Sequence, residues 1–95
     1  MAVVGLRIFD LHIPGAQSLK EKRYVLRSVK DRLGNGRYNI SIAEVGHLDK
    51  WQRTELAIAT VSGRRKSVER TLDAVRERLD REVGVSIIDT HTEIF

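Results

Sequence analysis

The pattern of apolar and polar residues near the start of the chain is typical of a β-strand. The segment Val3–Ile13 is rich in large apolar side chains, and in its second half these alternate with polar ones. Successive side chains of a strand point to opposite faces of a sheet, so a period of two indicates a strand. The pair Pro14-Gly15 ends this strand, because proline lacks an amide donor and glycine favours a turn.

Two later segments repeat their apolar residues every three or four positions, which is the period of an amphipathic helix. The first opens with Ser18-Leu19-Lys20-Glu21, a capping box in which the serine hydroxyl and the glutamate carboxylate each bond the other residue's amide. It ends at the turn-forming Gly34-Asn35-Gly36, which predicts a helix over roughly Leu19–Leu33. The second carries its apolar residues over Val68–Val83 and stops at Gly84.

Three further segments are predicted to be strands because apolar and polar residues alternate again. They are Tyr38–Val45, Thr54–Val61 and Val85–Phe95. The first two are joined by a short loop, which indicates an antiparallel hairpin. The order strand, helix, strand, strand, helix, strand predicts a single ferredoxin-like α+β domain over residues 1–95. In this βαββαβ sandwich, a four-stranded antiparallel sheet carries two helices on one face.

The first and third strands carry apolar residues on both of their sides. The additional ones are Val4, Leu6 and Ile8 in the first strand and Ala57, Ala59 and Val61 in the third. A sheet covered by helices on one side only should have one polar face. We therefore expect a partner over the open face, most simply a second copy in a homodimer. The alternative is a monomer, since some exposed aliphatic side chains are ordinary.

Composition indicates a globular protein of a reducing compartment. Of the 95 residues, 41% are hydrophobic and 32% are charged, a balance that supports a packed core. The chain has no cysteine, which excludes disulfides and thiolate metal sites and suits the cytoplasm. The N-terminal segment resembles neither a signal peptide nor a membrane span, so we expect no membrane association. Arginine outnumbers lysine twelve to five, which mildly favours a heat-adapted source.

Positive charge is concentrated in the first half of the chain. Residues 1–50 contain nine basic and five acidic residues, a difference of +4, whereas residues 51–95 contain eight of each. In the first predicted helix the cations Lys20, Arg23, Arg27 and Lys30 share one narrow arc, with Tyr24 beside it. One interpretation is a phosphate-contacting surface whose aromatic residue stacks on an unpaired base. The other is a solvated helix face with no partner.

Lys22 lies among the apolar positions of the same helix rather than with the other charges. Its place in the first turn allows it to pair with a strand carboxylate such as Asp10 or Glu44, or to extend past the helix end into water. The alternative is a role in binding an anion or in catalysis.

The loop before the third strand contains Asp49-Lys50-Trp51-Gln52-Arg53. Trp51 and Arg53 are of the residue types that dominate interface hot spots, and a tryptophan can also stack on a base. The alternative is that the Trp51 side chain folds back as a lid on the core.

Signals for catalysis or a cofactor are weak. The first and last strands are neighbours in this fold, so Asp10, His12, Asp89 and His91 lie on adjacent strands, but no short metal-ligand spacing occurs. The chain also lacks a cysteine nucleophile, a Gly-x-Ser-x-Gly elbow and a phosphate loop. We therefore predict a noncatalytic protein without a metal or a cofactor.

Six segments of the chain occur together in a specific order. They are Ile13-Pro14, the run Ser18–Arg23, Ala43-Glu44-Val45, Asp49, Trp51-Gln52-Arg53 and Val61-Ser62. Together they resemble the YlxP-like family of small bacterial proteins, and the resemblance covers nearly the whole chain. The resemblance implies a ferredoxin-like fold and a family without an established biochemical activity. Family members are often encoded beside translation and ribosome-maturation factors, which implies a link to RNA by association only. Where members often carry Asn-Asp after Val-Ser, this chain has Gly63-Arg64.

Three functional hypotheses follow. The first is an RNA- or ribosome-associated accessory protein. Its candidate contacts are Lys20, Lys22, Arg23, Arg27, Lys30, Trp51 and Arg53. The second is a homo-oligomeric regulatory or scaffolding module with no nucleic-acid role. The third, an enzyme acting on a phosphorylated or acylated small molecule, has the least support.

Overall fold

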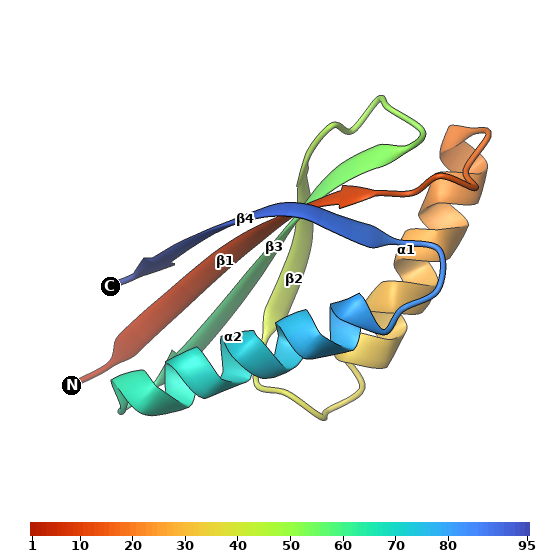
Figure 1. Ribbon diagram of the computed structural model, residues 1–95. Coiled ribbons are helices and arrows are strands. Elements are labelled where there is room, and N and C mark those ends of the chain that lie inside the picture. The colour runs from red at the N-terminus through yellow and green to blue at the C-terminus, as the bar shows by residue number, and fades with distance from the viewer.

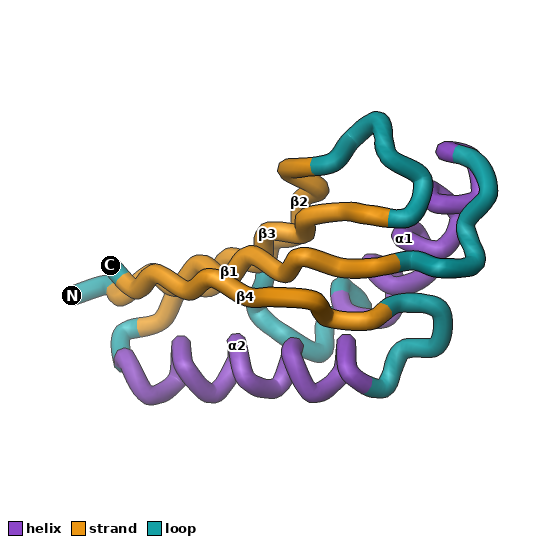
Figure 2. The backbone as a smooth tube through the Cα atoms, turned by 45° about the horizontal axis from the view of Figure 1, so that its top comes forward, coloured by secondary structure: helices purple, strands orange, loops and turns teal.

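The fold is a ferredoxin-like βαββαβ sandwich, as the sequence pattern predicts. The computed structural model describes residues 1–95. Its elements are β1 (Val3–His12), α1 (Leu19–Leu33), β2 (Ser41–Gly46), β3 (Arg53–Ser62), α2 (Arg65–Asp80) and β4 (Ser86–Ile94). The strands form one antiparallel sheet in the order β2-β3-β1-β4. Both helices lie on one side of this sheet, and its other side is open (Figures 1 and 2).

The core lies between the sheet and the two helices. Alternate residues of β1 and β3 meet the apolar sides of α1 and α2, and all of these side chains are almost completely buried. They are Phe9 and Leu11, Leu56 and Ile58, Leu26 and Val29, and Leu72 and Val75. The helix α2 also approaches β1 closely at Gly5, where a Cβ atom would collide with the side chain of Val68. Glycine at this position therefore allows α2 to pack against the sheet.

The helix α1 has the bounds that its capping box and glycine turn predict. Ser18 has an extended backbone, and its hydroxyl accepts a hydrogen bond of 3.1 Å from the amide of Glu21. At the other end, the amide of Gly34 donates to the carbonyl of Lys30 at 2.7 Å. The capping residues thus set where the helix begins and ends.

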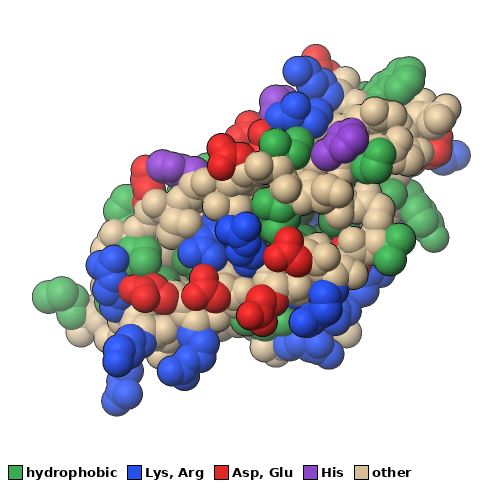
Figure 3. Space-filling model, in the orientation of Figure 1, with side chains coloured by type: hydrophobic (Ala, Val, Ile, Leu, Met, Phe, Trp, Pro, Cys, Tyr) green, Lys and Arg blue, Asp and Glu red, His purple; other side chains and the backbone are tan.

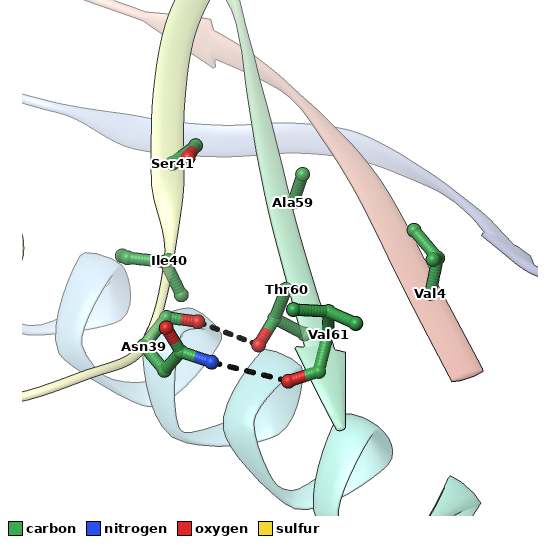
Figure 4. Close-up of a pocket in the computed structure, with 7 residues that line it drawn as sticks. All are labelled: Val4, Asn39, Ile40, Ser41, Ala59, Thr60 and Val61. Carbon is green, nitrogen blue, oxygen red and sulfur yellow. Dashed lines mark hydrogen bonds between the residues drawn. The ribbon is translucent and has the colours of Figure 1, made fainter. Parts of the chain in front are cut away.

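Two element boundaries differ by more than one residue from the sequence-based expectation. The strand β2 begins at Ser41 rather than Tyr38, because Asn39 is held by its own hydrogen bonds to the end of β3. Its side-chain amide donates to the backbone carbonyl of Val61, and its backbone carbonyl accepts from the hydroxyl of Thr60 (Figure 4).

The helix α2 ends at Asp80 rather than Val83. The chain turns back toward β4 through Gly84, whose φ is +93°. The amides of Arg81 and Glu82 bond to carbonyls three residues earlier, and Val83 is left almost fully exposed. The apolar residue at position 83 therefore continues the helical period without belonging to the helix. No helix in the fold is both long and apolar enough to cross a membrane.

Candidate nucleic-acid interface

The outward side of α1 carries a group of cations that have no acidic partner. They are Lys20, Arg23, Arg27 and Lys30, and we call them the α1 cations. None of them forms an ion pair, whereas seven ion pairs join other lysine or arginine side chains to carboxylates. Their spacing of three, four and three residues aligns them along one side of the helix. Like charges at this spacing repel each other, so the fold gains no stability from the arrangement.

A shallow hollow of about 320 Å³ lies on this surface, and its lining is wholly basic and aromatic. Its four residues are Lys20, Arg23, Tyr24 and Arg27. Tyr24 is 74% exposed and forms no hydrogen bond. Lys20 lies four residues before Tyr24 and Arg27 three residues after it, so both flank its ring along the helix. We call this the Tyr24 hollow.

A second hollow of about 270 Å³ continues along α1. It is lined by Arg23, Leu26, Arg27, Lys30, Asp31 and Glu44. Arg23 and Arg27 line both hollows, so the four α1 cations border one continuous surface. Acidic side chains enter only in the second hollow, through Asp31 and Glu44.

The helix α2 has a different charge distribution. Along it, Arg65 pairs with Glu69 at 2.9 Å, and Arg78 lies 3.4 Å from Glu82 just beyond the helix end. Figure 3 views the molecule from the side of α2, where acidic and basic side chains lie next to one another along the helix. Opposite charges on α2 thus lie next to one another and largely cancel, whereas the α1 cations have no acidic partner.

Lys22 points inward and is only 1% exposed. Its ammonium group lies 2.8 Å from the Glu44 carboxylate and donates to the carbonyl of His47 at 2.7 Å. The hydroxyl of Thr54 also donates to Glu44, at 2.7 Å. The expected ion pair between Lys22 and a strand carboxylate is confirmed, with Glu44 as the partner. Lys22 joins α1 to the β2–β3 hairpin and does not line either hollow on α1.

Trp51 and Arg53 line neither of the two hollows on α1. Trp51 is 53% exposed, so the alternative in which it closes the core as a lid is wrong. The neighbouring Gln52 connects this loop to the β1–α1 turn, because its side-chain amide donates to the backbone carbonyls of Pro14 and Ala16. This loop and the β1–α1 turn therefore lie at the same end of the molecule (Figure 1).

Arg53 takes part in a polar cluster on the open face of the sheet. Its guanidinium group donates to both carboxylate oxygens of Asp10, at 2.8 and 3.3 Å. The Nε2 atom of His47 lies 4.0 Å from the same carboxylate. Asp10 lies opposite Asp89 in the sheet, whereas His12 lies opposite Ser86. No group of three or more side chains is placed to hold a metal ion here or elsewhere in the protein.

One ion pair that the sequence pattern did not indicate joins α1 to the end of α2. The guanidinium group of Arg32 contacts both carboxylate oxygens of Glu82, at 2.6 to 2.9 Å. The hydrogen bond from Arg32 holds the pKa of Glu82 below its ordinary value, and the same bond raises the pKa of Arg32. Because the two residues are fifty positions apart, no local motif could reveal the pair. It connects the C-terminal end of α1 to the turn that follows α2.

The open face of the sheet is apolar at the end where the two termini lie. Val4 is paired with Val61 on one side and exchanges two backbone hydrogen bonds with Phe95 on the other. These three residues form one row across the sheet, and they are 40%, 50% and 69% exposed. A hollow of about 170 Å³ lies beside Val4 and Val61, between the end of β3 and the start of β2 (Figure 4). The expected second apolar face of β1 and β3 is therefore present.

Comparisons with known proteins agree with the fold and with the resemblance noted in the sequence. The chain is 39% identical over 93 residues to the uncharacterized protein YlxP of Bacillus subtilis, which covers 98% of this chain and 100% of that protein. A de novo designed protein, Foldit4, has a similar fold, with a TM-score of 0.50 at 11% identity over 97% of this chain and 94% of the designed chain. A family described as protein of unknown function (DUF503) matches residues 4–92. The chain belongs to this DUF503 family, which includes the YlxP-like proteins.

Proposed function

We propose that the protein is a noncatalytic accessory protein that binds RNA or ribosomal particles through the outward side of α1. One observation carries the proposal: the α1 cations have no acidic partners and surround an exposed aromatic ring. Lysine and arginine side chains neutralise backbone phosphates, and aromatic side chains stack on bases. The net charge of +4 supports association with a polyanion. The proposal places this function in the cytoplasm, where ribosomes and their RNA are found.

The remaining candidate contacts enter the proposal in different ways. Trp51 is exposed on a loop at the same end of the molecule as the start of α1, so it serves as an additional contact. Arg53 is engaged with Asp10, and a phosphate would have to compete with that carboxylate for it. Lys22 is buried and paired with Glu44, so it supports α1 from within and makes no direct contact with RNA.

The test is co-sedimentation of the purified protein with ribosomal particles at low ionic strength. We expect binding that weakens as salt is added, because phosphate contacts release condensed counterions. A double charge reversal, Arg23→Glu with Arg27→Glu, should abolish it. The matched control is Lys66→Glu with Arg70→Glu on α2, which changes the net charge by the same amount at two exposed residues outside any ion pair. Absence of binding by the unmodified protein would overturn the proposal, as would equal losses in the two double variants.

A second candidate role is that of a homodimer formed through the open face of the sheet. The row of Val4, Val61 and Phe95 supports it, because a sheet with a solvated face is ordinarily polar there. The exposed surface is 6031 Å², whereas a compact monomer of 10.8 kDa exposes about 5,500 Å². The additional exposed area reflects the elongated shape of the molecule, which measures 45 × 21 × 17 Å.

Sedimentation equilibrium at micromolar concentration tests this second role. We expect a dimer, and we expect Val61→Asp to convert it to a folded monomer because the new carboxylate would lose its water on association. Glu77→Gln, a change at an exposed residue of α2 that forms no ion pair, is the control and should leave the dimer intact. A monomer at this concentration in the unmodified protein would refute the dimer.

A further inference from the structure

We propose that the Tyr24 hollow is a binding site for single-stranded RNA, in which one unpaired base stacks on the Tyr24 ring while Lys20, Arg23 and Arg27 hold the adjoining phosphates. This inference rests on the proposed RNA-binding function and specifies the form of RNA that the surface takes. It assigns the aromatic residue, rather than the cations alone, to the selection of the ligand.

The packing of the fold does not explain why a tyrosine is present at position 24. Its side chain is the most exposed of the five aromatic residues in the chain, its hydroxyl has no hydrogen-bond partner, and it does not pack against the core. Tyrosine is a poorer helix former than lysine, arginine or glutamate, which are the usual residues at exposed helical positions. The exposed Tyr24 ring therefore makes the folded protein slightly less stable than a lysine or glutamate at this position would. A ligand that covers the ring would remove its apolar surface from water, which favours binding.

The positions of the cations fit a nucleotide centred on the ring. Lys20 and Arg27 are seven residues apart, which is about 10 Å along a helix, and Tyr24 lies between them. A base stacked on the ring would have one phosphate toward Lys20 and another toward Arg27, while Arg23 lies beside the ring. The hollow of about 320 Å³ is at the lower end of the range for small-ligand sites, which suits one nucleotide rather than a folded element.

The combination of ring and cations favours a single strand over a duplex. In double-stranded RNA the faces of the bases are covered by neighbouring base pairs, so proteins recognise the duplex by its shape, phosphates and 2′-hydroxyl groups. Such recognition requires no aromatic side chain at the centre of the cations. Single strands expose the base faces, and stacking on an aromatic side chain is then available to every base. We therefore expect little dependence on base sequence.

Fluorescence anisotropy with two labelled RNAs tests the inference. One is an unstructured single strand of about twelve nucleotides, and the other is a blunt duplex of the same length. We expect the single strand to bind more tightly at equal salt. Tyr24→Ala should weaken single-strand binding by about 5- to 100-fold, which corresponds to the loss of one stacked base. Tyr24→Phe should stay close to the unmodified protein, because stacking requires the ring and not the hydroxyl.

Val83→Ala is the control, since Val83 is an exposed apolar residue after the end of α2 that lies outside both the Tyr24 hollow and the apolar row of the open face. It should leave RNA binding unchanged. Equal affinity of Tyr24→Ala and the unmodified protein for the single strand would overturn the inference while the proposed function stands. Tighter binding of the duplex would do the same. If neither RNA nor ribosomal particles bind, the proposed function fails and the inference fails with it.

Discussion

Replacing Lys22 with methionine separates the structural role of this residue from a role in RNA binding. Methionine keeps an unbranched apolar side chain at a position that is only 1% exposed, so the packing around α1 changes little. The ammonium group is lost, together with its contacts to the Glu44 carboxylate at 2.8 Å and the His47 carbonyl at 2.7 Å. Glu44 then has no cation within ion-pairing distance, and the His47 carbonyl loses its donor.

The expected loss of stability is about 3 kcal/mol. Breaking a buried ion pair by removing one partner costs roughly 3–5 kcal/mol, because the other charge is left without compensation. The lower end applies here, since the side chain of Glu44 is 20% exposed and still accepts a hydrogen bond from Thr54. In a domain of this size, a loss of 3 kcal/mol lowers the melting temperature by roughly 12–24 °C.

Urea denaturation followed by circular dichroism at neutral pH measures this loss. The control is the double variant Lys22→Met with Glu44→Leu, which removes both charges and should recover part of the stability, because an uncharged pair needs no compensation. An unfolding free energy within about 0.5 kcal/mol of the unmodified protein for Lys22→Met would refute the structural role.

RNA binding by the folded variant is the second measurement. The affinity of Lys22→Met for the single strand should stay within about twofold of that of the unmodified protein, whereas Arg27→Glu should lower it at least tenfold. A similar loss in both variants would mean that Lys22 itself reaches the RNA.

Two further predictions concern how the helices are held in place. Glu82→Gln should lower the urea midpoint at pH 7, and its difference from the unmodified protein should fade on acidification. Folding lowers the pKa of the Glu82 carboxyl, so its contribution to stability is fully present at pH values above its ordinary pKa of 4.5. That contribution is lost as the pH falls through the lowered pKa. A difference that is equal at pH 7 and pH 3 would contradict this. Gly5→Ala should destabilise the protein by about 1–3 kcal/mol in the same urea assay, since its methyl group collides with Val68; an unchanged midpoint would show that α2 can shift freely.

Local signals in the sequence were sufficient to predict most of the fold. The capping box at Ser18 and the glycine turn after Leu33 fixed both ends of α1, because each depends only on residues within one turn of the helix. The end of α2 could not be predicted in the same way. Val83 continues the apolar period, but the helix has already ended at Asp80, and Gly84 redirects the chain toward β4. Tertiary connection, rather than local propensity, decides that boundary.

In the candidate site, too, the local sequence predicts one contact and gives no signal for another. Lys22 was an exception to its helix pattern, and that exception was sufficient to predict a buried ion pair and to name Glu44 as one of two possible partners. The pair between Arg32 and Glu82 gave no such signal, because both residues look like ordinary exposed charges in the sequence. Their contact depends on how α1 and α2 lie relative to one another, and side-chain periodicity does not determine that arrangement.

The RNA surface and the dimer surface are compatible because they lie on opposite sides of the sheet. The helices cover one face of the sheet (Figure 2). The α1 cations lie on the outward side of α1, whereas Val4, Val61 and Phe95 are on the open face of the sheet. A symmetric dimer formed through the open faces would leave both copies of the Tyr24 hollow accessible. Two hollows on one particle would engage a long RNA with greater avidity than one, provided that the strand spans both. The apolar face would then strengthen RNA binding without contacting RNA, which gives the two surfaces one joint function.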